Sequence, residues 1–290
     1  MAALVYFIAI PFIYLLSLLP FGLLYLISDF VFFIIYHLVG YRKQVVKTNL
    51  RNAFPTYTGQ QIDKITHDFY KYFCDLLLET FKTLTISQKS MLRHCTLSPT
   101  TQQLFDRLNQ EKKSVILVLG HFGNWEWAGN TFSLLCHQQL YVIYHPLHNK
   151  YFDGLMYRMR TRFGTRLIAM KNVYKDMLKN KGAINTTAFI ADQTPSPDNA
   201  YWTIFLNQDT PVFKGTEVIA KKLDLPVVYT RVRRVKRGYY EIDADILHNS
   251  PRNTVDGEIT ELHTKRLEQD IMLQPEIWLW SHRRWKHKRK

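Results

Sequence analysis

A histidine and a carboxylate lie five residues apart near the middle of the chain, at His121 and Glu126. A carboxylate on one imidazole nitrogen fixes the tautomer and leaves the other nitrogen free as a general base. No serine or cysteine adjoins this pair in the sequence, so the base is expected to activate a hydroxyl or amine of a substrate. A buried histidine that caps the following helix is the alternative that the spacing alone leaves open.

The residues around His121 predict a corner that would bring the two side chains together. Residues 115–119 form a continuous apolar run that ends at a glycine, as in a buried strand of an α/β sheet. The segment from Trp125 has helical spacing, and Asn124 suits its N-cap. On one helix the two side chains would point about 140° apart, whereas a strand–turn–helix corner can fold the carboxylate back onto the imidazole. His121 would then lie at the carboxyl end of a strand, where open α/β sheets usually place their sites.

The sequence His-Phe-Gly-Asn-Trp-Glu-Trp at residues 121–127 resembles the His-x4-Asp/Glu motif of glycerolipid-type acyltransferases. Within that group, the motif is most similar to the one in the bacterial late acyltransferases of lipid A biosynthesis. Residues 41–55, 144–149, 213–227 and 274–290 resemble further segments of that family, so the resemblance covers most of the chain. It implies that His121 is the catalytic base and that Glu126 holds and charge-stabilises the imidazole. One departure is His145, which stands where the family usually has arginine.

More residues are assigned to the site through this resemblance. Arg158, by its position relative to the central motif, best matches the arginine that the family uses in its site. Asp192 and Gln193 follow another predicted strand, at residues 183–190, and look like the family's second motif. With Asn124, these residues are predicted to bind substrate, and Asp192 is expected to orient Arg158 or the acceptor. Guanidinium suits phosphate because it is permanently charged and bonds phosphate oxygens in pairs. A solvated arginine and a turn-capping aspartate are the alternatives from the residues alone.

The first 40 residues are almost wholly apolar, and Asp29 is their only charged side chain. Because a helix needs about 20 apolar residues to cross a bilayer, residues 1–40 are predicted to form a transmembrane or interfacial anchor. Residues 41–290 would be a cytoplasmic acyltransferase domain, since Arg42 and Lys43 follow the anchor at once. The segment lacks a basic n-region and a small-residue cleavage site, which argues against a removable signal peptide. A buried hairpin packed on a soluble domain is the alternative.

The chain has a formal net charge of +14 and 14% aromatic residues, which together indicate binding to nucleic acid or to an anionic membrane. In the tail, Trp278, Trp280 and Trp285 alternate with arginines and lysines and are predicted to form an interfacial surface. The apolar segment at the other end favours the membrane over nucleic acid. Three widely spaced cysteines favour reduced thiols, and His145 and His148 lack the companions of a metal site.

These features predict an α/β fold in which a mostly mixed central β-sheet is flanked by helices, with an N-terminal membrane-anchoring helix. The resemblance implies an acyltransferase at the cytoplasmic face of the cell inner membrane. It would move a fatty acyl chain from acyl carrier protein, in preference to coenzyme A, to a hydroxyl of an anionic lipid A precursor. The thioester is a co-substrate, and no metal or other cofactor is implied. Backbone N–H groups after Gly123 are candidates to stabilise the oxyanion.

Two other readings remain open from the sequence. The first keeps the histidine–carboxylate pair and changes the acceptor to a lysophospholipid, an aminolipid or a glycolipid. The second is a non-catalytic basic protein that binds a membrane or nucleic acid.

An acidic carrier protein, as the acyltransferase interpretation requires, would be attracted to a surface as basic as this one.

Overall fold

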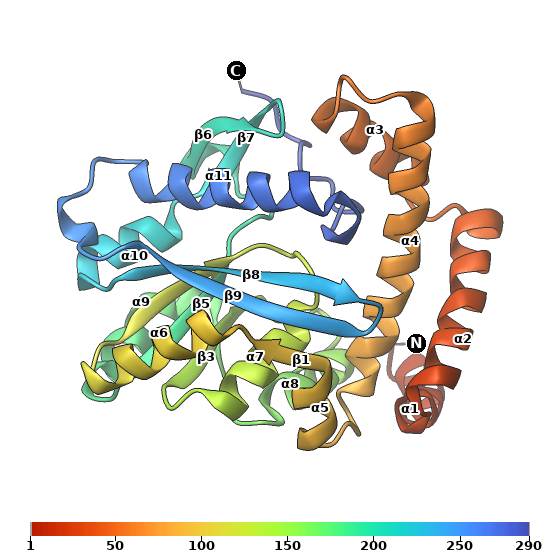
Figure 1. The fold of residues 1–290 in the computed structure, drawn as a ribbon, viewed down its shortest axis with the longest axis horizontal. Helices are drawn as coiled ribbons and strands as arrows, with labels where there is room; N and C mark the ends of the chain where they lie inside the picture. Colours follow the sequence, from red (N-terminus) through yellow and green to blue (C-terminus); the bar gives the residue numbers. More distant parts are fainter. Residues whose placement is uncertain (1, 290) are drawn as a thin grey trace.

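A seven-stranded mixed β-sheet forms the centre of the structure, a computed structural model that describes residues 2–289 (Figure 1). The strand order is β1-β9-β8-β2-β5-β3-β4, and every neighbouring pair is parallel except the β8–β9 hairpin. The strands are β1 (Cys95–Leu97), β2 (Val115–Leu119), β3 (Gln139–Tyr144), β4 (Arg166–Ala169), β5 (Asn185–Ile190), β8 (Val227–Lys236) and β9 (Tyr239–His248). This architecture confirms the predicted α/β fold with a mixed central sheet.

Helices cover both faces of the sheet (Figure 1). They are α3 (Lys43–Ala53), α4 (Gly59–Lys82), α5 (Gln88–His94), α6 (Pro99–Gln110), α7 (Trp125–Leu135), α8 (Lys150–Thr161), α9 (Val173–Lys179), α10 (Gly215–Leu223) and α11 (Glu258–Leu273). On one face, Phe105 of α6 and Phe132 of α7 join Leu117 in a core cluster. On the other face, Leu267 of α11 joins Val118. Successive residues of β2 thus point to opposite faces and each finds an apolar layer.

The two middle strands create a shared edge for the residues that follow them. β2 and β5 are almost wholly buried, which explains why each lacks the alternation of a half-exposed strand. Their parallel register pairs Leu119 with Ile190. His121 and Asp192, each two residues beyond this pair, therefore leave the sheet side by side.

A separate antiparallel ribbon lies over the α11 side of the sheet and was not predicted from the sequence (Figure 1). It consists of β6 (Ala200–Phe205) and β7 (Gln208–Phe213). The turn residues Leu206 and Asn207 both have positive φ, and the backbone N–H of Leu206 donates to Glu268 of α11 at 2.6 Å. This bond fixes the ribbon to the domain.

The C-terminal tail packs into the domain. Trp278 and Trp280 are 2% and 0% exposed, and their indole N–H groups donate to Asp192 and to the carbonyl of Pro275. Trp285 is part-buried and donates to β7. The prediction that these rings form an interfacial surface is therefore wrong, because each indole has found an acceptor inside the protein.

The N-terminal segment forms helices that lie against α4. They are α1 (Ala2–Leu18), α2 (Phe21–Phe33) and the π-helical turn η1 (Ile34–Val39). By length and composition alone, Phe21–Val39 is long and apolar enough to cross a membrane. Figure 1 shows α2 beside α4, and the residues that α2 buries are Leu24, Ser28 and Phe32, spaced one turn apart. The predicted apolar helix is present, and one stripe of it faces the domain.

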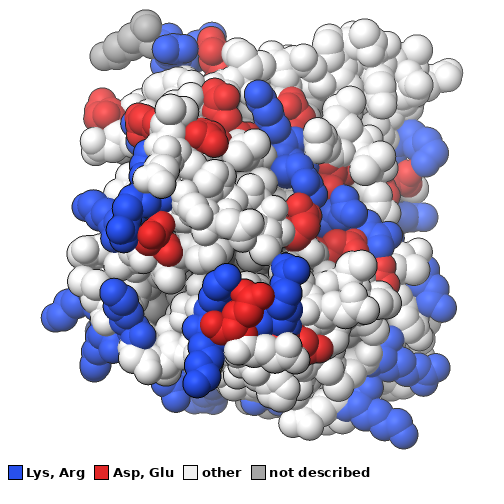
Figure 2. All heavy atoms as spheres, turned by 60° about the vertical axis from the view of Figure 1, so that its left-hand side comes forward, with Lys and Arg blue, Asp and Glu red and all other residues white. Residues whose placement is uncertain are grey.

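Charged side chains are dispersed on the face of the molecule drawn in Figure 2. Lysines and arginines are spread across this face, and aspartates and glutamates lie among them. The formal charge of +14 is therefore not gathered into one basic stripe on this side of the protein.

Candidate active site

His121 leaves the carboxyl end of β2 and is held by Asp192, which leaves the end of β5. The imidazole Nδ1 lies 2.6 Å from Oδ1 of Asp192, and the backbone N–H of His121 donates to Oδ2 at 2.7 Å. Trp278 donates its indole N–H to the same Oδ2 at 2.8 Å. All three contacts treat the carboxylate as an acceptor, so Nδ1 carries the proton and Nε2 is left free to accept one.

The electrostatics of Asp192 support this assignment. Burial opposes the charged carboxylate, but the attraction of His121 and the three hydrogen bonds outweigh it and lower the pKa of Asp192 to about 2. The group is therefore ionised at neutral pH and favours the protonated imidazole that forms when Nε2 takes a proton. Asp192 was expected to orient Arg158 or the acceptor, and the structure instead places it on the histidine.

Glu126 does not bond the imidazole, contrary to the prediction from its spacing. Its two carboxylate oxygens pair with Nε and Nη2 of Arg160, with Nε distances of 3.0 and 3.2 Å. The reason is topological: Glu126 lies in the first turn of α7 and meets α8, whereas the parallel strand register brings Asp192 to His121. Glu126 still lines the same cavity as His121, and its catalytic assignment stays a prediction.

Arg160, rather than Arg158, lines the cavity beside His121, and the substrate-binding assignment of Arg158 stays a prediction. Arg158 is exposed and forms no hydrogen bond or ion pair with the described residues. Burial would lower the pKa of Arg160, but Glu126 beside it reverses the shift and raises the pKa above the ordinary value for arginine. Both arginines flank the same apolar stripe of α8, so the sequence held no signal that would separate them.

Asn124 and Gln193 take different places. Asn124 is fully buried, accepts from the backbone N–H of Trp127 at 2.9 Å and donates to Glu79 at 2.8 Å. Its predicted N-cap role is confirmed; its side chain does not line the cavity, and its substrate-binding assignment stays a prediction. Gln193 does line the cavity, and its amide nitrogen lies 3.4 Å from Nε2 of His121.

The cavity beside this pair has a volume of about 420 Å³. Its polar wall is formed by His121, Glu126, Arg160 and Gln193, and the remaining wall is largely apolar or aromatic. A smaller apolar chamber of about 50 Å³ lies between α7 and the sheet. The two spaces share wall residues, which are Trp125, Gly129, Val142 and Ile190. A polar reacting centre therefore adjoins an apolar interior, which suits a molecule with a polar head and an alkyl chain.

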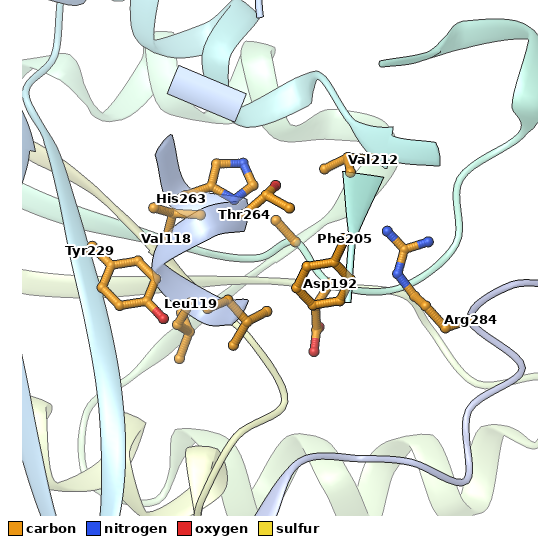
Figure 3. Close-up of a pocket in the computed structure, with 11 residues that line it drawn as sticks. Val118, Leu119, Asp192, Phe205, Val212, Tyr229, His263, Thr264 and Arg284 are labelled. Atoms are coloured by element: carbon orange, nitrogen blue, oxygen red, sulfur yellow. The ribbon is translucent and has the colours of Figure 1, made fainter. Parts of the chain in front are cut away.

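A third, very small pocket is lined in part by Asp192, His263 and Arg284 (Figure 3). Burial lowers the pKa of His263 to about 4 and lowers the pKa of Arg284 to about 10, despite the attraction of Asp192. At neutral pH His263 is therefore uncharged, whereas Arg284 keeps its charge close to the carboxylate. The sequence analysis assigned the basic residues of the tail to an interfacial surface. The structure instead buries Arg284, which is 2% exposed.

Among residues 2–289, no group of three or more His, Cys, Asp or Glu side chains is arranged to hold a metal ion. The chemistry that the described side chains can perform is proton abstraction by Nε2 of His121. The guanidinium of Arg160 and the amide of Gln193, which line the same cavity, can bind anionic or carbonyl oxygens.

Comparison with known proteins extends the similarity beyond the site. The profile of the family described as bacterial lipid A biosynthesis acyltransferase matches residues 1–287. A lipid A biosynthesis palmitoleoyltransferase from Escherichia coli (strain K12) is 22% identical over 250 residues, covering 84% of this chain and 79% of that protein. A lipid A biosynthesis acyltransferase from Haemophilus influenzae is 22% identical over 279 residues, covering 94% of this chain and 85% of that protein. The family match covers the N-terminal helices as well as the α/β domain.

Proposed function

Because the chain belongs to the bacterial lipid A biosynthesis acyltransferase family and is an acyltransferase, we propose a specific reaction for it. It moves a fatty acyl chain from the thioester of acyl carrier protein to a hydroxyl of a lipid A precursor. The reaction takes place at the cytoplasmic face of the inner membrane. The observation that carries the proposal is that His121 is fixed by an ionised Asp192 while it lines a cavity with polar and apolar walls.

The proton chemistry follows from the hydrogen bonds of His121. Nε2 takes the proton of the acceptor hydroxyl as its oxygen attacks the thioester carbonyl carbon. The tetrahedral intermediate collapses, the C–S bond breaks, and the departing thiolate takes the proton back from the imidazolium. Asp192 stays ionised throughout and stabilises the imidazolium. The products are one ester and one thiol, and the histidine is regenerated.

The Glu126–Arg160 pair has a different part in this proposal. Glu126 occupies the Nε and Nη2 edge of the guanidinium, which fixes its plane. Nη1 of Arg160 is then available for a phosphate or carbonyl oxygen of a substrate, because guanidinium donors match such oxygens. Glu126 is thus a positioning residue for Arg160 rather than for His121.

The apolar walls accommodate the alkyl part of the substrates. The chamber of about 50 Å³ under α7 has room for only a short piece of chain, so most of an acyl group would lie in the larger cavity. An acidic carrier protein is attracted by the net charge of +14, which favours its encounter with the enzyme.

The first test is mass spectrometry of lipid A from cells with and without the gene. Loss of one acyl chain, with accumulation of the matching precursor, is the expected result. An unchanged lipid A with a missing phospholipid or aminolipid would replace the acceptor and keep the chemistry. No change in any lipid would contradict acyl transfer to a membrane lipid.

The second test uses purified protein, acyl carrier protein loaded with a fatty acid, and the accumulated precursor. His121→Ala should lower turnover by at least ~10²-fold, the lower end of what general-base catalysis contributes. His145→Ala is the matched control, because His145 lines the same cavity and its only hydrogen bond among the described residues is to the adjacent Pro146 carbonyl. Unchanged turnover of His121→Ala, in a folded protein, would remove the histidine from the mechanism.

A further inference from the structure

The outer faces of α1, α2 and η1 form one continuous apolar surface. Between residues 3 and 39 the only charged side chain is Asp29. Large apolar side chains that are half or more exposed lie along the whole segment, and they are Leu4, Val5, Phe7, Ile8, Phe12, Leu15, Leu18, Leu23, Leu26, Phe30, Phe33, Leu38 and Val39. A surface of this extent is not stable in water and requires an apolar partner.

The inner face of α2 is bonded to α4 along its length. Ser28 donates to Asp75 at 2.7 Å, and Tyr25 donates to Glu79 at 2.8 Å. Both acceptor carboxylates are buried. Further along, the Lys71 ammonium lies 5.8 Å from the ring centre of Phe32. The partners on α4 come in descending order as α2 ascends, so the two helices run antiparallel side by side (Figure 1).

Two further contacts fix the ends of this arrangement to the α/β domain. Arg237, in the turn between β8 and β9, pairs with Asp29 at 2.8 Å and with Asp75 at 2.7 Å. Lys82 donates to the carbonyls of Ser17 and Leu19 at the corner between α1 and α2. Asp29, the one charge in the apolar segment, is therefore already neutralised by the domain.

This attachment decides how deeply α2 can enter a bilayer. A helix that crosses the hydrocarbon core must have lipid or apolar protein around it at every depth. Here α4 lies at the same depth as α2 and carries charged side chains such as Asp68 and Lys71. A bilayer that enclosed all of α2 would also enclose these groups and the adjoining β8–β9 turn, which is strongly unfavourable.

The apolar surface also reaches the site. Tyr6 of α1 stacks on Tyr151 of α8 at a ring distance of 5.3 Å and meets Phe152 edge-on. Leu147, which precedes α8, is 48% exposed and lines the large cavity. The end of α8 supplies Arg160 to the same cavity. The apolar surface therefore adjoins residues that line the cavity.

We propose that α1, α2 and the start of α8 form a monotopic surface that dips into a single leaflet of the bilayer and does not cross it. The proposal has a second part, which rests on the proposed function: a lipid acceptor reaches His121 from that leaflet, past Leu147. The partner is an anionic phospholipid leaflet, because Arg42 and Lys43 follow the apolar segment directly and can meet its phosphates. Both ends of α2 lie on the same side of the membrane as the α/β domain.

The depth of the helices in vesicles tests the topology. The full chain carries one spin label at a time, at Ile8→Cys, Leu23→Cys, Phe30→Cys or Leu38→Cys, in a Cys136→Ala background, since Cys74 and Cys95 are buried. Vesicles contain phosphatidylethanolamine and phosphatidylglycerol, and accessibility to oxygen and to a water-soluble nickel complex gives the depth. Leu23 and Leu38 lie about 22 Å apart along a helix, which exceeds half of the bilayer core.

A monotopic surface predicts that all four labels lie within ~10 Å of the phosphate level, with Leu23 and Leu38 at similar depths. A depth that passes through the bilayer centre between Leu23 and Leu38 would overturn the proposal. Free access of the nickel complex to all four labels would also overturn it, since the surface would then not meet lipid. Acyl transfer in the same vesicles separates the two hypotheses. If the labels show that α2 crosses the bilayer and acyl transfer still occurs, only the monotopic topology is rejected. If the labels are all shallow and no acyl transfer occurs, only the proposed reaction is rejected.

A charge on the apolar surface provides an independent check. Phe12→Glu and Phe30→Glu should each reduce sedimentation with these vesicles at least tenfold. They should leave transfer to a detergent-dispersed acceptor within twofold of wild type. Val255→Glu is the matched control, because Val255 is 70% exposed on a loop of the α/β domain and should not affect sedimentation. Equal sedimentation of all three variants would contradict the assigned surface.

Discussion

Two carboxylates hold side chains that line the large cavity, and the partners they hold differ in kind. Asp192 is buried and holds His121, whose charge changes in the proposed reaction. Glu126 is bound to Arg160, whose charge is permanent. The first pair joins the ends of two parallel strands, and the second joins two helices.

In the proposed reaction, the His121–Asp192 pair serves proton transfer and the Glu126–Arg160 pair serves substrate binding. A carboxylate on an imidazole changes the energy of the charged intermediate and so acts on the chemical step. A guanidinium stays protonated, so a carboxylate bound to it can only fix the position of the guanidinium. Variants of the two pairs should therefore affect different kinetic constants.

Asp192→Asn should cause the largest loss. An amide cannot stabilise the imidazolium, and its NH₂ group would favour the wrong tautomer of His121. We expect kcat to fall by roughly 10³- to 10⁴-fold with little change in KM, as for the equivalent change in histidine-dependent triads. Steady-state kinetics of purified protein in vesicles measure both constants. A loss of kcat of the same size in Glu126→Gln would support the predicted pairing of Glu126 with His121 and would contradict the different roles assigned to the two carboxylates.

Arg160→Ala should have the next largest effect, on KM for the phosphorylated or thioester substrate. Removal of the guanidinium loses a charged hydrogen bond to substrate and leaves Glu126 without its partner, so KM should rise roughly 10- to 100-fold. Arg160→Lys keeps the charge without the paired donors, so its KM should lie between the KM of wild type and the KM of Arg160→Ala. A decrease in kcat at constant KM would instead assign Arg160 to the transition state.

The low pKa of Asp192 predicts a stability that depends on pH. Its folded-state pKa of about 2 lies below the ordinary 3.8, so the ionised group stabilises the fold above about pH 4. This contribution, about 2 kcal/mol, is lost as the pH falls through about 2. Denaturant unfolding between pH 5 and pH 2 should show a steeper decline for wild type than for Asp192→Asn. Parallel declines would show that Asp192 titrates normally.

Arg158→Ala should have the smallest effect. The side chain is exposed and has no ion-pair partner among the described residues, so kcat/KM should change less than ~2-fold. Assayed beside Arg160→Ala, this variant decides which arginine of α8 belongs to the site. A large loss would mean that substrate binding turns Arg158 into the cavity, as the sequence predicted.

The two ends of the chain offer a second comparison. Both are rich in aromatic residues, yet Trp278 is 2% exposed and Phe12 is 63% exposed. Composition predicted a membrane role for both. The tail packs inward because the indole of Trp278 can donate to Asp192, whereas phenylalanine has no polar atom to satisfy and one face of α1 has no protein beside it.

Much of the sheet could be predicted because its strands are continuous local patterns. The predicted strand at residues 115–119 coincides with β2, and the predicted strand at residues 183–190 overlaps β5. β1 has only three residues and β4 four, too few for a period to be visible. The β6–β7 ribbon was not predicted, and a tertiary hydrogen bond from Leu206 to Glu268 of α11 fixes it to the domain.

The sequence by itself determined the α/β fold, the position of His121 at a strand end, the N-cap at Asn124 and the presence of an apolar N-terminal helix. Each of these depends on residues close together in the chain. Only the tertiary structure decided which carboxylate holds His121 and which arginine reaches the cavity. Those contacts depend on the register of β2 against β5 and on the packing of α7 against α8, and no local period records such a register.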